Sequence, residues 1–409
     1  MPLDLKKLLI ARFLFTFAVQ MQAVILGWRI YELLKNPLYL GLIGLSEAIP
    51  AIGLAIFAGY LVDKSRPLLV YRRVMYVSLI SGALVLAEHL LINQLSLPIQ
   101  VGLLYFAAFL TGIARSFSQP SIYSALPRLV ERQELLSATA TMSSAMQTAR
   151  IAGPAFGGLA YGFLGATASS TIVCASLLFA VTMMISIKKV IPPSINQHSN
   201  KHSSIKEELF SGLNFVIKHP ILLPALTLDM ISVLFGGVTA LLPIFASEIL
   251  MVGSQGLGLL RAAPAVGATI MNIYLAKSSI KNRAGLWLFV GVSGFGCSIL
   301  LFGLSQNFIL SLIALMLSGL FDSISMVIRS LAVQLSSPDH MRGKISAVNS
   351  IFIGSSNEIG EVESGIAARL LGTVPAVYFG GIVCLLTVMV VAVLSPKLRN
   401  LDLEKLDNK

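Results

Sequence analysis

Residues 8–34 read LLIARFLFTFAVQMQAVILGWRIYELL, an apolar run with few polar interruptions. An α-helix rises 1.5 Å per residue, so about 20 residues cross the roughly 30 Å hydrocarbon core of a bilayer. Lys6 and Lys7 before the run make it resemble a secretory signal. The run is too long for the apolar core of a signal peptide, and no clear small-residue cleavage site follows it. It therefore predicts a retained first membrane-spanning helix.

The composition of the whole chain points to lipid as its main solvent. Of the 409 residues, 56% are hydrophobic and only 12% are charged, and the mean hydropathy is +0.82. A soluble domain carries about 25% charged residues. The composition therefore argues against a soluble protein.

Twelve apolar runs are long enough to span a bilayer, and they fall into two sets of six. The runs are 8–31, 39–62, 69–92, 99–122, 138–163, 168–187, 220–247, 256–276, 284–304, 308–333, 344–368 and 373–394. A polar stretch between the sets predicts a linker with one surface helix from Ile205. The expected domains are an N-terminal six-helix bundle at 1–187, a cytoplasmic linker at 188–219, a C-terminal six-helix bundle at 220–395 and a cytoplasmic tail at 396–409.

The distribution of basic residues predicts how the chain is oriented. The net charge is +11, and most of the 30 Lys and Arg residues lie in alternate connections, in the linker and in both tails. Basic residues concentrate in cytoplasmic loops. Both termini are therefore expected in the cytoplasm, in agreement with an even number of spans. Short basic clusters between apolar runs also argue against a nucleic acid partner.

The two halves of the chain repeat weakly. Gly112-Ile-Ala-Arg115-Ser pairs with Gly319-Leu-Phe-Asp322-Ser, and Leu164-Gly-Ala pairs with Leu371-Gly-Thr at the same separation. Internal repeats in transporters place a shared site between the halves, near the bilayer midplane. The repeat favours an all-α membrane protein whose twelve transmembrane helices form two pseudo-symmetric bundles.

Two motifs give the chain a resemblance to the major facilitator superfamily. After the second run stands Gly59-Tyr-Leu-Val-Asp63-Lys64-Ser-Arg66, which resembles the loop signature of that family. In the fifth run, Gly153-Pro154-Ala-Phe-Gly157-Gly158 matches a motif associated with its antiporters. Ala11-Arg12-Phe13 and the segment 370–377 are similar to the enterobactin-exporter-like branch. The resemblance implies the major facilitator fold and secondary transport.

Each motif also has a direct physical interpretation. Asp63 among cations can bind the positive N-terminal end of a neighbouring helix and act as a gate, or the cluster only sets the topology. The matching loop of the second half has no Asp. The glycines of the fifth run let a neighbouring backbone approach, and Pro154 removes one backbone donor. The resemblance implies a seal that favours export; the alternative is simple tight packing.

Ionisable residues inside the runs are costly in lipid, which makes them functional candidates. They are Arg29, Glu47, Arg115, Arg150, Asp229, Arg261, Asp322, Arg329, Glu358, Glu361 and Glu363. They fall on the helices that line the cavity in the resembled fold. The candidate substrate-binding residues are Gln20, Gln22, Arg29, Glu47, Arg150, Arg261 and Asn357. Helix packing is an equal explanation for Gln20 and Gln22.

The eleventh run is polar and rich in glycine in its middle. Glu358 and Glu361 are three residues apart and share a helical face, and Glu363 follows. Neighbouring carboxylates resist ionising together, so one can hold a proton near neutral pH. We expect one of these residues to be the proton-coupling site, with Asp229 as a second. The alternative is structural pairing with Arg150 or another Arg.

Arg115 and Asp322 occupy equivalent positions of the repeat, which suggests a gating ion pair on the cytoplasmic side. The alternative is separate pairing, such as Asp322 with Arg329, or extension of Arg115 toward water.

The expected function is proton-coupled export of a small polar or charged organic molecule, siderophore-like or drug-like, by alternating access. The alternatives are a multidrug or lysolipid transporter of the same fold and a non-transporting membrane sensor. No nucleotide-binding loop, catalytic constellation or intramembrane metal-ligand set is found, so we expect neither an enzyme nor a cofactor or metal. The expected partners are the substrate, protons and membrane lipids, for a monomer in a bacterial inner membrane.

Overall fold

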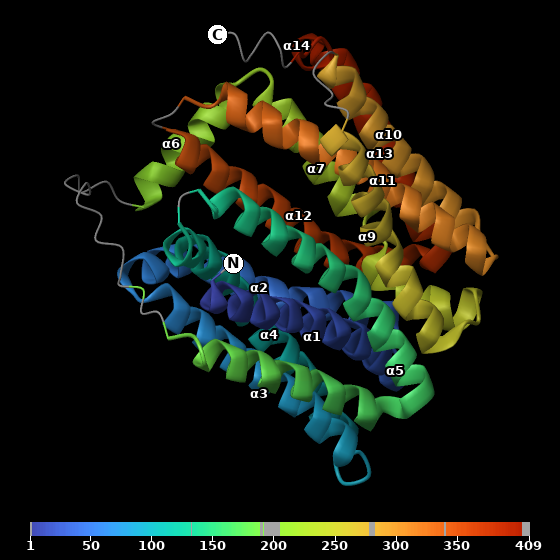
Figure 1. Ribbon diagram of the computed structural model, residues 1–409. Helices are drawn as coiled ribbons and strands as arrows, with labels where there is room; N and C mark the ends of the chain where they lie inside the picture. The colour runs from blue at the N-terminus through green and yellow to red at the C-terminus, as the bar shows by residue number, and fades with distance from the viewer. Residues whose placement is uncertain are drawn as a thin grey trace. The chain divides into compact units, whose positions relative to one another are not determined.

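The computed structural model describes residues 2–131, 133–188, 191, 205–277, 283–338 and 341–402, and every regular element in them is a helix (Figure 1). Ten of the described helices are long and apolar enough to cross a bilayer. The prediction of an all-α membrane protein is confirmed.

The first half of the chain forms five long helices that begin at recognisable signals. Pro37 and Pro67 each stand in the first helical turn, where a missing N–H costs nothing. The Asn36 side chain also accepts a hydrogen bond from the Leu38 N–H at 3.0 Å. The helices are α1 (Leu3–Leu34), α2 (Pro37–Lys64), α3 (Pro67–Leu90), α4 (Leu97–Leu129) and α5 (Leu135–Ile185).

The second half begins with a short helix at Ile205, where the sequence predicted one. Its elements are α6 (Ile205–Lys218), α7 (Leu222–Gly236), η1 (Thr239–Leu241), α8 (Leu242–Ile244), the π-helical η2 (Phe245–Ile249), α9 (Gly253–Lys277), α10 (Ala284–Leu304), α11 (Phe308–Ser336), α12 (Arg342–Leu371), α13 (Thr373–Leu394) and α14 (Pro396–Arg399). The neutral ring of His219 accepts hydrogen bonds from the Ile221 and Leu222 N–H groups at the start of α7. Burial lowers the pKa of His219, which favours this neutral form.

The described chain divides into two compact units. Unit 1 contains residues 1–197 and 242–262, and unit 2 contains residues 198–241 and 263–409. Within unit 1, α1 packs along α5, and α4 packs on both α2 and α3. Within unit 2, α10 packs on α11 and α13, and α7 packs on α12 and α13.

Two glycines interrupt the helices at equivalent positions of the repeat. Gly165 breaks α5 with φ 84° and ψ 173°, and Gly372 separates α12 from α13 with φ 94° and ψ 156°. Both conformations have a positive φ that residues with a Cβ rarely adopt. The sequence predicted a break between spans at both places.

The helix α12 is not among the ten apolar helices because its middle is polar. It nevertheless extends over 30 residues from Arg342 to Leu371. The sequence predicted this combination of a long helix and a polar centre.

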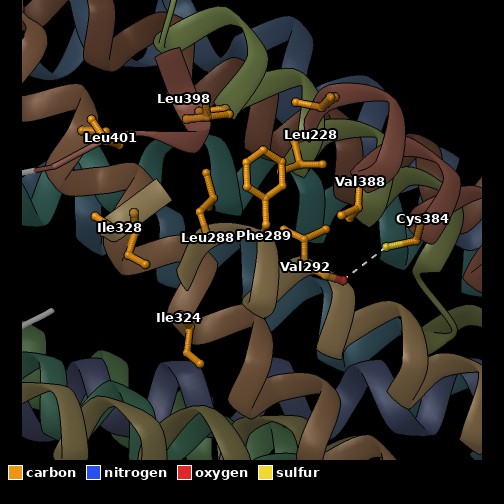
Figure 2. Packing of buried hydrophobic residues seen from close by; sticks show 14 residues of the cluster. Leu228, Leu288, Phe289, Val292, Ile324, Ile328, Cys384, Val388, Leu398 and Leu401 are labelled. Atoms are coloured by element: carbon orange, nitrogen blue, oxygen red, sulfur yellow. Dashed lines mark hydrogen bonds between the residues drawn. The ribbon is translucent and has the colours of Figure 1, made fainter. Parts of the chain in front are cut away.

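A tight apolar core holds unit 2 together. Leu228 of α7, Phe289 and Val292 of α10 and Val388 of α13 pack against one another (Figure 2). The Cys384 thiol donates to the Val292 carbonyl at 3.6 Å, so this buried cysteine joins α13 to α10. Leu398 of α14 is also buried in this core, so the start of the expected tail is packed against unit 2.

Candidate transport site

The glycines of α5 allow backbone contact with two other helices of unit 1. A Cβ added at Gly153 would lie 2.7 Å from the Phe17 carbonyl oxygen of α1, and one at Gly157 would lie 2.9 Å from the Met21 carbonyl oxygen. A Cβ at Gly158 would overlap the Ser254 carbonyl oxygen and lie 2.6 Å from the Cα of Gly258, both on α9. Pro154 is buried beside these glycines. The motif therefore provides a seam where no side chain fits.

The segment 242–262 is fixed to unit 1 by polar contacts as well. The Tyr31 hydroxyl of α1 donates to the Glu248 carboxylate of η2. The Arg261 guanidinium of α9 donates to the Ala23 carbonyl of α1 at 2.6 Å. Arg261, a candidate for substrate binding, thus joins the segment to α1.

Polar residues of α1 bind partners on α3 at a constant separation of 59 residues. Arg12 donates to the Tyr71 hydroxyl at 3.1 Å, Gln22 donates to the Ser81 hydroxyl at 2.7 Å, and Arg29 donates to the Glu88 carboxylate at 2.8 Å. A constant separation means that the two helices run parallel in fixed register. Gln22 and Arg29, expected to bind substrate, are both buried in this seam.

The seam ends in a buried cluster that sequence reasoning missed. Glu88 is fully buried, Arg29 binds it in a forked geometry, and the His89 Nε2 lies 3.3 Å from it. The His89 Nδ1 lies 2.7 Å from the Ser170 hydroxyl of α5, and Gln100 of α4 accepts from Arg29 at 3.3 Å. A buried ion pair with this many hydrogen bonds holds four helices in one arrangement.

Arg150 of α5 has one arginine of α1 and one of α4 in its electrostatic surroundings. Arg150 lies within electrostatic range of Arg12 and Arg115. Arg150 is exposed, whereas Arg12 is buried. The Arg115 guanidinium donates to the Glu47 carboxylate of α2 at 2.9 Å, which joins two residues that the sequence assigned to different roles. Gln20 is half-buried, and its Cβ lies against Gly153.

Unit 2 contains a second buried ion pair. Asp229 of α7 pairs with Arg329 of α11, and both side chains are buried. Asp322, half-buried on the same helix as Arg329, is not the carboxylate of this pair. Arg115 belongs to unit 1 and Asp322 to unit 2, so their proposed gating pair stays a prediction.

The polar centre of α12 packs against α7. Glu361 and Glu363 are half-buried, and Asn357 is exposed with its amide donating to the Ile353 carbonyl at 2.9 Å. The Ser364 hydroxyl donates to the Gly237 carbonyl at 2.7 Å, which fixes α12 to the end of α7. The side chain of Glu358 lies outside the described residues.

The sequence placed the loop motif after the second helix, but Gly59, Asp63 and Lys64 form the last turns of α2, and only Arg66 follows it. Gly59 has open space around it, and Lys64 and Arg66 are exposed. The side chain of Asp63 lies outside the described residues, so its gating role stays a prediction. Nowhere in the described ranges do three or more His, Cys, Asp or Glu residues form a group that could hold a metal.

The comparisons agree with the motifs and the helical architecture. Over residues 8–361 the chain matches the Major Facilitator Superfamily. The enterobactin exporter EntS of Escherichia coli O1:K1 / APEC is 25% identical over 246 residues, and the match spans 60% of this chain and 58% of that exporter.

Solved transporters share the fold at low sequence identity. A POT family transporter in complex with a thioalcohol-conjugated peptide is 12% identical, with a TM-score of 0.76 and 96% of both chains covered. A bacterial homologue of the iron transporter ferroportin, in an inward-facing state, is 16% identical with a TM-score of 0.71, over 97% of this chain and 99% of that one. The chain is therefore a multi-pass membrane protein that belongs to the Major Facilitator Superfamily, a family of transporters and not of enzymes.

Proposed function

We propose that the chain is a proton-coupled exporter of a small polar or charged organic molecule that works by alternating access. Substrate and proton would shift the balance between inward-open and outward-open states through their different affinities for the two. The protein would lie in a bacterial inner membrane with both termini in the cytoplasm. The ionisable residues within the spans favour a polar or charged substrate, and the weak similarity to an enterobactin exporter favours a siderophore-like one.

Equivalent glycines support an arrangement of twelve spans in two related bundles. Division of α5 at Gly165 gives two spans, and α12 adds a polar one to the ten apolar helices. A Cβ at Gly112 would overlap the Glu47 carbonyl of α2, and a Cβ at Gly319 would overlap the Pro264 carbonyl of α9. The same close approach thus recurs at equivalent positions of the two halves.

The observation that carries proton coupling is the pair of half-buried carboxylates on α12. Glu361 and Glu363 lie on a long helix that packs against the apolar α7. Acidic residues within spans form the proton relays of many transporters. Glu358, Glu361 and Glu363 are therefore our candidates for the coupling site, and Asp229 is the second.

Export is supported by the seam between α5 and α9. Gly153, Pro154, Gly157 and Gly158 bring α5 into contact with α1 and with the segment 242–262. We assign this contact to the outer seal of the exporter, which would open to release substrate.

Removal of the gene is expected to deplete one polar organic compound from the culture medium and to raise its level inside the cell. The measurement is an untargeted comparison of metabolites in medium and cells, with and without the gene. Restoring the gene should restore the compound, whereas an Asp63→Asn variant should not, because the loop gate would be impaired.

Other outcomes of this comparison favour other functions. Release of many unrelated drugs would indicate a multidrug transporter instead, and release of lysolipids would indicate a lysolipid transporter. An unchanged medium, together with an Asp63→Asn variant that leaves the cellular response intact, would favour a sensor and overturn export.

A further inference from the structure

We propose that Arg12, Arg115 and Arg150 form a binding site for an organic anion that carries a carboxylate or phenolate on a flat apolar body. This inference names the substrate class of the proposed exporter and rests on that function for its role in transport. The binding itself follows from the arrangement of residues within unit 1.

Contacts among α1, α4 and α5 place the three arginines at similar levels of unit 1. The Arg12 guanidinium donates to the Gln119 side chain at 2.9 Å, and Gln119 lies one helical turn from Arg115 on α4. Gly153 lies against Phe17 and Gln20, so Arg150, one turn earlier on α5, lies at the depth of the turn after Arg12.

The charges of this cluster are not balanced by the described residues. Among the described residues, the groups that accept hydrogen bonds from Arg12 are neutral, namely Tyr71, Ser118 and Gln119. Arg150 has two positive neighbours and, within the described ranges, no carboxylate in an ion pair with it. Glu47 compensates only one of the three positive charges. A bound anion would offset the remaining charge, which is costly within a membrane-spanning segment.

Two other buried arginines of the described chain are balanced by a carboxylate. Arg29 is paired with Glu88 on α3, and Arg329 is paired with Asp229 on α7. These two arginines have the carboxylate that a structural role requires. Arg12 is equally buried but has none among the described residues, which points to a ligand as the source of negative charge.

Exposed aromatic rings of α4 and α5 suit a flat apolar body. Tyr123 of α4 is 72% exposed and interacts electrostatically with Arg150. Phe156 of α5, six residues beyond Arg150, is 57% exposed and contacts Phe17 of α1 edge to face, with ring centroids 5.8 Å apart. Guanidinium groups bind carboxylates in a forked geometry, and aromatic rings stack on planar ligands. The class of ligand is therefore an aromatic or similarly flat organic anion.

Three probes of nearly equal shape test the proposal: 2-naphthoate, neutral 2-naphthamide and cationic 2-naphthylmethylammonium. Binding is measured by calorimetry at pH 7.5 on the purified full chain in phosphatidylcholine nanodiscs. We expect 2-naphthoate to bind at least about tenfold more tightly than the amide and the cation to bind least well. Arg150→Gln should remove most of this preference, and Arg150→Lys should keep part of it. Arg73→Gln, which removes an exposed arginine at the start of α3, should leave it unchanged.

Two results would overturn the site: a wild-type protein that does not prefer the naphthoate, or an Arg150→Gln variant that keeps the full preference. Unchanged melting temperatures of the variants show that they are folded. Preference for the anion without any exported compound would refute the proposed function but leave the site in place. Export by a protein without this preference would refute the site but leave the proposed function in place.

Discussion

A Gly158→Val variant is expected to lose at least about 90% of export activity and to melt at a lower temperature than the wild type. The added Cβ would overlap the Ser254 carbonyl and crowd the backbone of Gly258, so the start of α9 must move away from α5. Backbone atoms cannot rotate aside as a flexible side chain can, and overpacking of this kind typically costs about 1–3 kcal/mol or more. Export of the compound found in the medium and the melting temperature in detergent are the measurements.

The matched control is Gly102→Val on α4. Gly102 is exposed and has open space where a Cβ would be placed. Both variants replace glycine by valine, but at Gly102 the new Cβ meets no backbone of a neighbouring helix. The export activity of the control should therefore stay near that of the wild type. Equal behaviour of the two variants would show that the seam between α5 and α9 is not needed.

An Asp229→Asn variant is expected to destabilise the protein by about 3–5 kcal/mol, because Arg329 would keep a buried charge without its partner. Arg329→Met should have an effect of similar size, because Asp229 would then keep a buried negative charge without its partner. The double variant Asp229→Asn/Arg329→Met removes both charges and should recover most of the free energy of unfolding. Unfolding of the purified protein in mixed micelles measures all three.

The double variant also separates stability from coupling. If Asp229 carries a proton during transport, the double variant should be stable but impaired in proton-driven export. A double variant whose loss of stability equals the sum of the two single losses would mean that the two side chains are not coupled, contrary to the observed ion pair.

The spans and the breaks between them could be predicted because they depend on local properties. Apolar length identified the helices and the breaks between spans, and the structure shows a glycine with positive φ at two of these breaks, Gly165 and Gly372. The polar centre of α12 was also visible in the sequence. These features depend on the bilayer and on backbone sterics, which act in the same way in any membrane protein.

Partners across helices were much harder to predict. Arg12 reads as part of a basic N-terminal cluster, yet its side chain is buried against Tyr71 and Ser118. Glu88 reads as a residue near the end of a span, yet it is the fully buried partner of Arg29. The one usable signal was the constant separation of polar residues in α1 and α3, which becomes visible only when the two helices are known to run parallel in register.

Proton movement by the reconstituted protein is the most direct test of the account. The purified chain is placed in proteoliposomes that contain the pH-sensitive dye pyranine, and the compound found in the medium comparison is added to one side. We predict that the compound drives protons in the opposite direction, and that at least one of Glu358→Gln, Glu361→Gln and Glu363→Gln abolishes this proton movement. Movement of the compound by the wild type with no proton movement, or normal coupling in all three variants, would contradict the account.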